Sequence, residues 1–504
     1  MLPFSNLSDD PKQEYFADGI TDSLITDLSQ VPGLFVTSRQ STLIYKGQGV
    51  DPKKIGRELG VATILEGSVQ KAGDQIRINA QLINATTGGH EWANRYDGSM
   101  NDIFGLQDRV TKAIVEALSL PQTSSGQSTA GQHETEIPSA YDAFLLGWEN
   151  YKRSTPTDLA AAIPHFERAI QLDPTYGRAQ AALAMIYFRA YDERWTGRLA
   201  ISMDDAYRKA RDYLSAAKAR PTSLFHQVAG SISRQRGWYD DAGKEFQAAI
   251  TLEPSDSWSY AYLAYSLIYA GRAAEAEPQI ETAMRLDPHY PALFLFYKGL
   301  AQFMQNRMEA ATITFAQAAK QDPDEPLPLL FLASAYGNLG QKKEGNEAIS
   351  AFNRARVRLG GVPFVMIQIT DDSPLLRPPK GAFLIKGLAE LGIPNNFDSS
   401  TFDDQRLTAP EVESLLFGHR IHGRSLESGL EHGTSVSPDG VAMMFGAWGS
   451  GAGTAKMEGN RLCVVSTTTQ RCGQILRNTG GTKEKENEYI WFQDWMGLTF
   501  SQQE

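Results

Sequence analysis

The clearest pattern in the chain is a repeated arrangement of small and large apolar residues between residues 139 and 358. Three segments place a glycine in the first helix and then an alanine and a phenylalanine four residues apart in the second helix, as Gly230, Ala242 and Phe246 do, and the segment closed by Pro288 has Ala276 and Ile280 at these last two positions. A proline turn ends each segment, and the successive prolines Pro221, Pro254, Pro288 and Pro323 are 33, 34 and 35 residues apart. A regular period of this length predicts pairs of helices that stack on their neighbours as a solenoid.

The turns between these segments share a phrase made of leucine, an acidic residue and proline. It occurs as Leu172-Asp173-Pro174, Leu252-Glu253-Pro254 and Leu286-Asp287-Pro288. A helix–turn–helix period near ~34 residues is typical of tetratricopeptide repeats. About six helix pairs are expected over residues 139–358, with an insertion near residues 191–203. Arrays of this type present extended binding surfaces, so the pattern favours a scaffold or regulator over an enzyme.

The amino-terminal part of the chain, residues 1–120, predicts an α/β domain. Its elements are a helix over 14–28, a short strand over 34–37, a helix from Asp51 to Gly60, strands over 62–70, 75–84 and 90–97, and a helix over 103–118. Residues 121–138 are polar and poor in large apolar groups, which predicts a flexible linker.

The carboxy-terminal part changes character twice. Residues 359–405 are rich in proline and glycine and predict a connector with a short helix over 380–391. Residues 406–504 are rich in Gly, Thr, Ser and aromatics, and turns separate short strands, which predicts a small β-rich domain. The predicted fold class is therefore multidomain: an α/β amino-terminal domain, an all-α tetratricopeptide solenoid and a small β-rich carboxy-terminal domain.

Composition excludes several classes of function. The net charge is −11 and no Lys/Arg cluster occurs, which argues against nucleic acid as a partner. No run of ~18 apolar residues is present, so no membrane span is expected, and the first residues do not resemble a secretory signal. The sequence contains neither a phosphate-binding P-loop nor a nucleophile elbow. We therefore expect no catalytic residues, no cofactor and no metal, and enzyme activity is not expected of this chain.

The two cysteines, Cys463 and Cys472, are nine residues apart in a strand-like region. A hairpin could bring them together as a disulfide, which would indicate an oxidising compartment. The alternative is two free buried thiols. A zinc site that also used His419 and His422 would need a tetrahedral set of ligands, and these spacings match no known template.

The concave side of the solenoid is the predicted binding surface. The first helix of each pair lines this side, and positions two, five, nine and twelve of that helix are expected to point inward. The residues predicted in this way are Trp258, Tyr265, Ile268, Leu293, Phe296, Leu300 and Phe303. An aromatic, apolar groove suits an amphipathic or extended peptide or a partner domain. The alternative is that these residues pack between repeats or against the carboxy-terminal domain.

Several motifs in the amino-terminal part resemble the TolB-like domain of bacterial proteins. They are Leu2–Ser8, Gln13–Ile20, Ser41-Thr42, Tyr45-Lys46-Gly47, Gly56–Val61, Leu65–Val69 and Asp102-Ile103-Phe104. In that family the domain lies between a class III adenylate/guanylate cyclase domain, or a DNA-binding domain with a membrane helix, and tetratricopeptide repeats. With the repeats, the resemblance covers residues 1 to about 395. Residues 407–504 are similar to small bacterial β domains of barrel or lipocalin-like type.

This resemblance implies three alternative functions. The first is a non-catalytic regulatory module of a bacterial signalling protein that binds a protein or peptide. The second is the carboxy-terminal regulatory part of an adenylate or guanylate cyclase whose catalytic domain, a further candidate partner, is missing from this chain. The third is a periplasmic sensor whose β domain binds a ligand. Localisation is cytoplasmic for the chain as written, or on the periplasmic side of the inner membrane if an upstream segment is missing.

Overall fold

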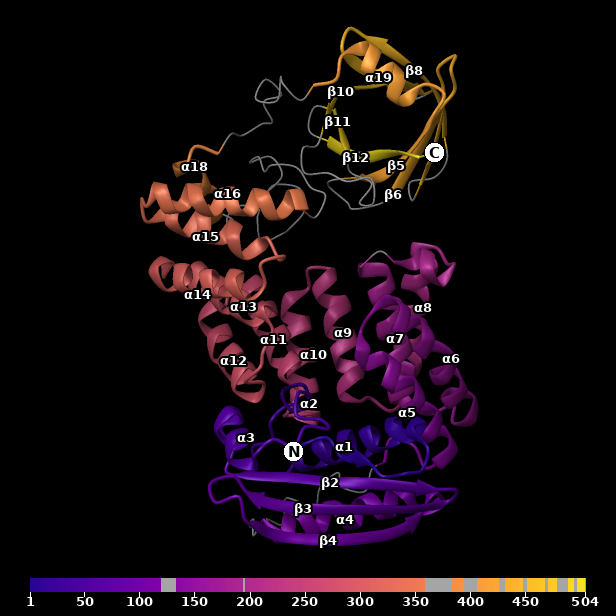
Figure 1. Ribbon diagram of the computed structural model, residues 1–504, viewed down its shortest axis with the longest axis vertical. Coiled ribbons are helices and arrows are strands. Elements are labelled where there is room, and N and C mark those ends of the chain that lie inside the picture. Colours follow the sequence, from indigo (N-terminus) through magenta and orange to yellow (C-terminus); the bar gives the residue numbers. More distant parts are fainter. Residues whose placement is uncertain are drawn as a thin grey trace. The chain divides into compact units, whose positions relative to one another are not determined.

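The computed structural model describes residues 1–118, 133–193, 195–358, 382–393, 406–425, 431–446, 451–466, 470–477, 488–493 and 496–503. The chain divides into two compact units, Met1–Phe294 and Leu295–Glu504. The first unit holds an α/β domain and four helix pairs, and the second holds further helices and an eight-stranded barrel (Figure 1). Most of the predicted linker (121–138) and of the predicted connector (359–405) lies outside the described residues.

A four-stranded sheet of order β1-β2-β3-β4 forms the base of the amino-terminal domain. Strand β1 (Ser5–Asn6) runs parallel to β2 (Thr63–Ala72). Strands β2, β3 (Gln75–Asn84) and β4 (His90–Ser99) are antiparallel neighbours. The three strands predicted over residues 62–97 are confirmed within two residues at each end.

Alternating apolar residues make one face of this sheet into a core layer. Ile76, Ile78 and Leu82 of β3 are almost completely buried, because successive side chains of a strand point to opposite faces. Helices α1 (Glu14–Ser29) and α4 (Ile103–Ala117) supply the other side of the same core. The sheet therefore holds both helices in fixed positions.

The strand predicted over residues 34–37 is wrong. This segment belongs to no strand of the sheet. It leads instead to Ser38, whose backbone N–H donates a hydrogen bond to the carbonyl oxygen of Leu286 at 2.7 Å. The short helices α2 (Arg39–Leu43) and α3 (Pro52–Leu59) follow. A short apolar run has the same local pattern whether it pairs with a strand or packs on a distant loop.

The described part of residues 138–358 forms six helix pairs. The pairs are α5 (Pro138–Arg153) with α6 (Pro156–Leu172), α7 (Gly177–Asp192) with α8 (Met203–Ala217), α9 (Ser223–Gln235) with α10 (Tyr239–Leu252), α11 (Ser257–Tyr269) with α12 (Ala273–Leu286), α13 (Ala292–Met304) with α14 (Met308–Gln321), and α15 (Leu327–Asn338) with α16 (Lys342–Arg358). An extra 3-10 turn at Thr196–Leu199 lies within the predicted insertion.

Glycine in the first helix lets a phenylalanine of the second helix pack directly on the backbone. A Cβ atom at Gly147, Gly230 or Gly299 would lie 2.8, 2.9 or 2.7 Å from the ring of Phe166, Phe246 or Phe315, respectively. The three phenylalanine side chains are fully buried. The recurring Gly–Phe pattern of the sequence is therefore the contact that closes three of the six helix pairs, α5 with α6, α9 with α10 and α13 with α14.

We expect Gly230→Ala to lower the free energy of unfolding by about 1–3 kcal/mol, because the added methyl group overpacks against Phe246. Gly243→Ala in α10 is the matched control, since its Cβ atom would lie 3.7 Å from Leu263, an ordinary contact distance. Alanine is favoured over glycine inside a helix by about 0.5–1 kcal/mol, so this control should stabilise. Urea denaturation followed by circular dichroism measures both, and a Gly230→Ala protein as stable as wild type would contradict the packing.

The last described helix of the second unit's array is α18 (Ala382–Glu390), which packs on α15. Ser334 Oγ and Asn338 Nδ2 of α15 donate hydrogen bonds to the carbonyl oxygen of Phe383 at 3.1 and 2.7 Å. The sequence placed this helix in a connector. In the structure it covers the exposed side of the last helix pair.

The carboxy-terminal part of the second unit is a closed barrel of order β10-β11-β12-β5-β6-β7-β8-β9. Its elements are α19 (Ala409–Leu416), β5 (Arg420–Ser425), β6 (Glu431–Val436), β7 (Val441–Gly446), β8 (Gly451–Glu458), β9 (Arg461–Ser466), β10 (Gln470–Arg477), β11 (Tyr489–Gln493) and β12 (Met496–Gln503). The buried residues Ile475 and Phe500 lie in the barrel core together with Val412 of α19.

The predicted fold class is confirmed in all three parts: an α/β domain, a helical solenoid and a β-rich domain. Among the described helices, none combines the length and the apolar character that a bilayer crossing requires.

Candidate functional site

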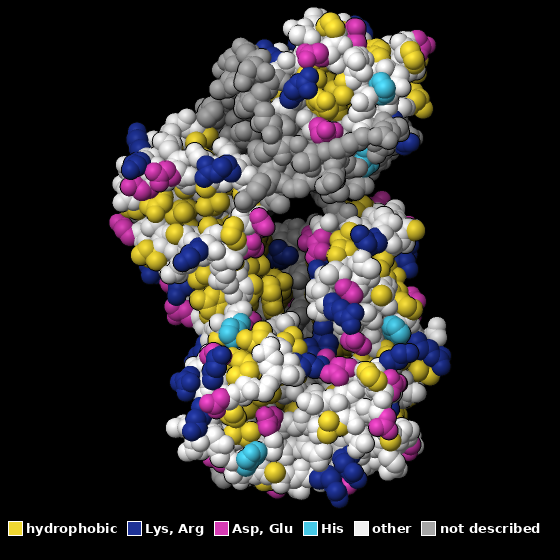
Figure 2. All heavy atoms as spheres, in the orientation of Figure 1, with side chains coloured by type: hydrophobic (Ala, Val, Ile, Leu, Met, Phe, Trp, Pro, Cys, Tyr) yellow, Lys and Arg dark blue, Asp and Glu magenta, His cyan; other side chains and the backbone are white. Residues whose placement is uncertain are grey.

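The first helices of the repeat pairs line a groove in the first unit. Helices α5, α7, α9 and α11 form its walls, and α1 together with the first turns of α4 closes one side. The cavity has a volume of about 830 Å³, within the range of roughly 300–1,000 Å³ that is usual for ligand sites. Figure 2 shows both basic and acidic side chains where the amino-terminal domain meets the repeats.

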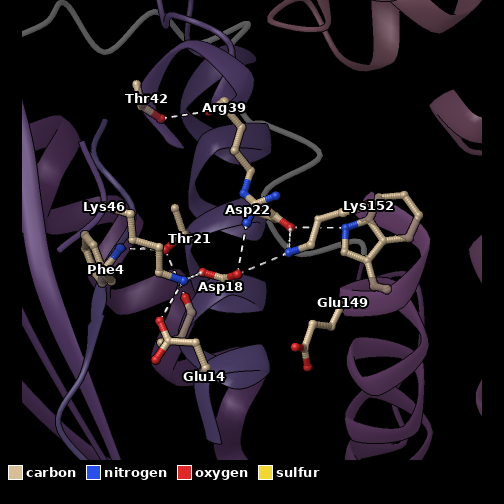
Figure 3. A network of polar contacts seen from close by, with 12 residues as sticks. Phe4, Glu14, Asp18, Thr21, Asp22, Arg39, Thr42, Lys46, Glu149 and Lys152 are labelled. Atoms are coloured by element: carbon tan, nitrogen blue, oxygen red, sulfur yellow. Dashed lines mark hydrogen bonds and ion pairs between the residues drawn. The ribbon is translucent and has the colours of Figure 1, made fainter. Parts of the chain in front are cut away.

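A buried ionic network fixes α1 against the first repeat (Figure 3). Asp18 pairs with Lys46 at 2.5 Å, with Arg39 at 3.1 Å and with Lys152 of α5 at 3.6 Å. Asp22, one turn later, pairs with Arg39 and, at 3.3 Å, with Lys152. The network therefore joins three segments of the chain that are far apart in sequence.

The electrostatic balance of this network favours the ionised carboxylate. Burial alone would raise the pKa of Asp18, but Lys152, Arg39 and Lys46 together hold the pKa below its ordinary value. Trp148 of α5 adds a neutral contact, since its indole N–H donates to Asp22 Oδ2 at 3.1 Å. The ionised state of Asp18 thus depends on the basic groups that surround it.

Close approach of α1 and α5 depends on a glycine. A Cβ atom at Gly19 would lie 2.5 Å from Leu145 Cδ2, so a larger residue would require the Leu145 side chain or the helices to shift. At the edge of the same contact, Tyr15 Oη donates to Asp142 Oδ1 at 2.8 Å, and Lys71 Nζ pairs with the same oxygen at 2.8 Å. The wall that α1 contributes to the groove is therefore held in place at several points.

The segment after α1 also contacts two turns of the array. Gln30 Nε2 donates to the carbonyl oxygen of Leu252 at 3.0 Å, and Ser41 Oγ donates to Asp287. The guanidinium group of Arg285 lies 4.9 Å from the ring centre of Phe35. The amino-terminal domain therefore touches the turns after α10 and α12 as well as helix α5.

Arg178 of α7 shows how this cavity accommodates a cation. Its guanidinium carbon lies 4.6 Å from the ring centre of Trp148 and 5.3 Å from that of Phe144. Its Nη1 atom is 3.5 Å from the carboxylate of Glu134. An aromatic face and a carboxylate together stabilise a buried guanidinium group.

Among the residues that the structure describes, the carboxylates of Glu253 and Asp256, at the start of α11, are not paired with a basic side chain in the way that Glu134 is paired with Arg178. Burial raises the pKa of Glu253 to about 7, and the neighbouring Asp256 and Glu134 add to this effect while Arg178 and Ser223 oppose it. Burial also raises the pKa of Asp256, although that carboxylate accepts hydrogen bonds from two backbone N–H groups of α11. Both residues line the cavity.

The raised pKa of Glu253 predicts a pH-dependent stability. Its pKa is about 7 in the folded protein against 4.5 ordinarily, so the folded state holds the proton more tightly. This contribution is complete below pH 4.5 and is lost as the pH rises through about 7, by up to about 3 kcal/mol. Glu253→Gln should remove most of this loss in urea denaturation at pH 5, 6, 7 and 8. Parallel pH profiles for variant and wild type would contradict the assignment.

The predicted groove residues of α11 and the start of α13 lie in unlike environments. Trp258 is half-buried and lines the cavity. Tyr265 is half-buried, and the guanidinium carbon of Arg234 lies 5.2 Å from its ring centre. Ile268 is fully buried, whereas Leu293 is half-buried.

The other predicted groove residues belong to the second unit. Phe296, Leu300 and Phe303 are only 7%, 1% and 1% exposed. The rings of Phe296 and Phe303 each lie 5.6 Å from that of Phe331, between helices of the same unit. This packing leaves the three side chains little surface for a partner.

The two cysteines lie opposite each other in the barrel. Cys463 of β9 and Cys472 of β10 are paired residues and form a disulfide. Their sulfur atoms lie near a carboxylate oxygen of Glu458, and among the described residues neither His419 nor His422 joins this group. A disulfide offers no thiolate to a metal ion.

Sequence reasoning missed several residues of the cavity. Tyr151, Arg178, Glu253 and Tyr262 all line it. The one local signal was the repeated turn phrase, in which Glu253 stands where the other two copies have aspartate.

Comparison with known proteins supports the repeat assignment. Residues 263–326 match the family model described as tetratricopeptide repeat. A Rhizobium meliloti (strain 1021) protein named "Putative adenylate cyclase 3" is 40% identical over 221 residues, which are 44% of this chain and 38% of that protein. A Dictyostelium discoideum protein named "DnaJ homolog subfamily C member 7 homolog" is 21% identical over 326 residues, 64% of this chain and 53% of that protein. The chain thus spans less than two thirds of either relative.

Two solved structures align with part of the chain at low identity and low TM-score. Pseudomonas aeruginosa PilF is 16% identical with a TM-score of 0.34, over 43% of this chain and 91% of that one. YrrB, described as a TPR protein with an unusual peptide-binding site, is 21% identical with a TM-score of 0.28, over 39% of this chain and 91% of that one. The family match identifies residues 263–326 as tetratricopeptide repeats, and the other described helix pairs have the same helix–turn–helix form.

Proposed function

We propose that the groove lined by α5, α7, α9 and α11 binds a segment of a partner protein, and that the chain is a non-catalytic regulatory module of a bacterial signalling protein. The observation that carries this proposal is the cavity of about 830 Å³ with half-buried aromatic side chains in its wall. Tyr151, Trp258 and Tyr262 are rigid, partly accessible anchors of the kind that dominate binding energy at protein interfaces.

The amino-terminal domain, which we propose to be TolB-like, would take part in this recognition. Thr26 and Asp27 of α1, and Gln30 directly after it, line the same cavity as the repeat helices. A segment bound there would touch both the domain and the array, and would therefore favour the docked arrangement of the two. Partner binding in the groove would in this way change how firmly the amino-terminal domain is held to the repeats.

A second candidate function is favoured by the 40% identity to the Rhizobium meliloti protein named as an adenylate cyclase. In this case the chain is the regulatory part of an adenylate or guanylate cyclase, and its partner is a cyclase catalytic domain. Adding the purified chain to such a domain and measuring cyclic nucleotide production tests this directly. An unchanged rate at saturating chain concentrations would exclude this candidate.

Selection of displayed peptides on the full chain tests the groove proposal. We expect selected peptides to compete with one another for one site, measured by fluorescence anisotropy with the purified chain. Competition is expected because the groove is a single continuous cavity. Peptides that bind without competing, or a selection that recovers no binding peptide, would contradict the proposal.

A further inference from the structure

We propose that Glu253 and Asp256 receive an arginine side chain of the bound segment, with the ring of Trp258 as the wall against which the guanidinium group stacks. This inference rests on the proposed function and specifies the chemistry of its partner. All three residues line the cavity, and they come from the turn before α11 and its first turn.

The repeated turn phrase singles out Glu253. In the first copy, Asp173 accepts hydrogen bonds from Thr135 Oγ1 at 2.5 Å and from the backbone N–H of Thr175 at 2.9 Å. In the third copy, Asp287 accepts from Ser41 Oγ and from the backbone N–H of His289. These two aspartates are satisfied within the protein. Glu253 has a longer side chain, hydrogen-bonds to Ser223 and lines the cavity.

The charge of the cavity wall is unbalanced. The wall contains seven acidic side chains but only four lysine and arginine side chains. Lys152 pairs with Asp22 outside the cavity wall, Arg178 with Glu134 and Arg189 with Glu193, and the guanidinium group of Arg234 lies over the ring of Tyr265. Within the described part of the chain, no ion pair joins Glu253 or Asp256 to a basic side chain. A bound cation would supply that partner.

A second observation points to a polar ligand in the same part of the cavity. Tyr176 is fully buried and lines the cavity, and its hydroxyl group has no hydrogen-bond partner among the described residues. The ring of Tyr176 lies 5.1 Å from that of Phe144, over which the guanidinium group of Arg178 also lies at 5.3 Å, so the hydroxyl belongs to the part of the cavity that already holds one guanidinium group. The hydroxyl oxygen can accept a hydrogen bond from a guanidinium N–H.

The surroundings of Arg178 show how this cavity can stabilise the guanidinium group of a bound arginine. Arg178 already stacks on Trp148 at 4.6 Å and pairs with Glu134, so this cavity stabilises a guanidinium group by an aromatic face and a carboxylate. Trp258 with Glu253 and Asp256 repeats these components, and no cation of the described residues lies over the Trp258 ring. Arginine fits better than lysine because its planar fork can pair with carboxylates and stack on indole at once.

The raised pKa values of Glu253 and Asp256 agree with this assignment. The groups that face Glu253 are Asp256, Glu134 and Arg178, with the hydroxyl of Ser223. A cation brought into the site would stabilise the ionised carboxylates and release the proton held on them. Affinity for an arginine peptide should therefore increase as the pH rises from 6 to 8.

The test uses the full chain and pairs of selected peptides in which arginine is replaced by citrulline, its neutral isostere. For the wild type we expect citrulline to weaken binding at least about tenfold, because a buried charge pair is lost. For Glu253→Gln the same replacement should change affinity less than about twofold. Asp256→Asn should act similarly while still capping α11, since asparagine is a good N-cap residue. Glu275→Gln, an exposed acid of α12 outside the cavity, is the control and should behave as wild type.

Several results would overturn the inference. They are equal affinity for arginine and citrulline peptides, a tenfold difference that persists in Glu253→Gln, or selected peptides that carry lysine and lack arginine. If arginine amide alone displaces a peptide as well as the peptide itself does, the occupant is a small guanidinium compound and not a protein segment. Peptides that bind in the groove with no preference for arginine would leave the proposed function intact, whereas recovery of no binding peptide would overturn both.

Discussion

Asp18→Ala should lower the free energy of unfolding of the chain's first unit by about 3–5 kcal/mol, because removal of one partner from a buried ion network leaves its other charges uncompensated. Asp18 is 8% exposed, and Arg39, Lys46 and Lys152 surround it. In the variant these three cations would share Asp22 and Glu14. Since Lys152 belongs to α5, the loss should also loosen the contact between α1 and the array.

The measurement is urea denaturation of the full chain combined with hydrogen exchange of α1 and α5. Asp97→Ala is the matched control, because Asp97 also pairs with two arginines, Arg77 and Arg95, but on the exposed surface of the sheet. Exposed ion pairs contribute little, so the control should unfold like wild type. Equal stability of Asp18→Ala and Asp97→Ala, with unchanged exchange in α1, would show that the network does not hold the domain to the repeats.

Trp258→Ala should weaken binding of a selected peptide by about 30-fold or more, the effect of losing one aromatic anchor worth about 2 kcal/mol. The indole is half-buried in the groove wall and packs against Tyr262 and Phe294 at 5.5 and 5.2 Å between ring centres. Helical circular dichroism must remain unchanged, so that the loss reflects the groove and not the fold.

Trp238→Ala is the control for this variant. Trp238 is 54% exposed, lies in the turn between α9 and α10, and does not line the cavity. The same indole is removed in both variants, so a difference in affinity reports position alone. If Trp238→Ala weakens the peptide as much as Trp258→Ala does, the binding surface lies outside the groove.

The repeat array could be predicted from the sequence because its information is local. Gly230 and Phe246 belong to one helix pair, and the proline turns mark where each pair ends. The strands β2, β3 and β4 of the amino-terminal sheet could also be predicted, because apolar and polar residues alternate within each single segment. Residues 34–37 were not, because they pair with no strand and lead to Ser38, whose backbone partner is Leu286, some 250 residues away in the array.

The site could be predicted only in part. Counting fixed positions along a helix selected Trp258, which lines the cavity, but also Ile268, Leu300 and Phe303, which are buried. Burial in a solenoid depends on neighbouring helices, and that packing cannot be derived from the position in one helix. Helix α1 closes the groove through contacts such as that of Asp22 with Lys152, and no local sequence pattern predicts a contact between residues so far apart.

Photo-crosslinking tests the central claim most directly. p-Benzoylphenylalanine would be placed at Tyr151 in the groove wall and, separately, at Tyr207 of α8, which does not line the cavity. If the groove binds partner segments, a selected peptide should crosslink from position 151 and not from position 207. Crosslinking from position 207 alone, or equally from both, would contradict binding in the groove.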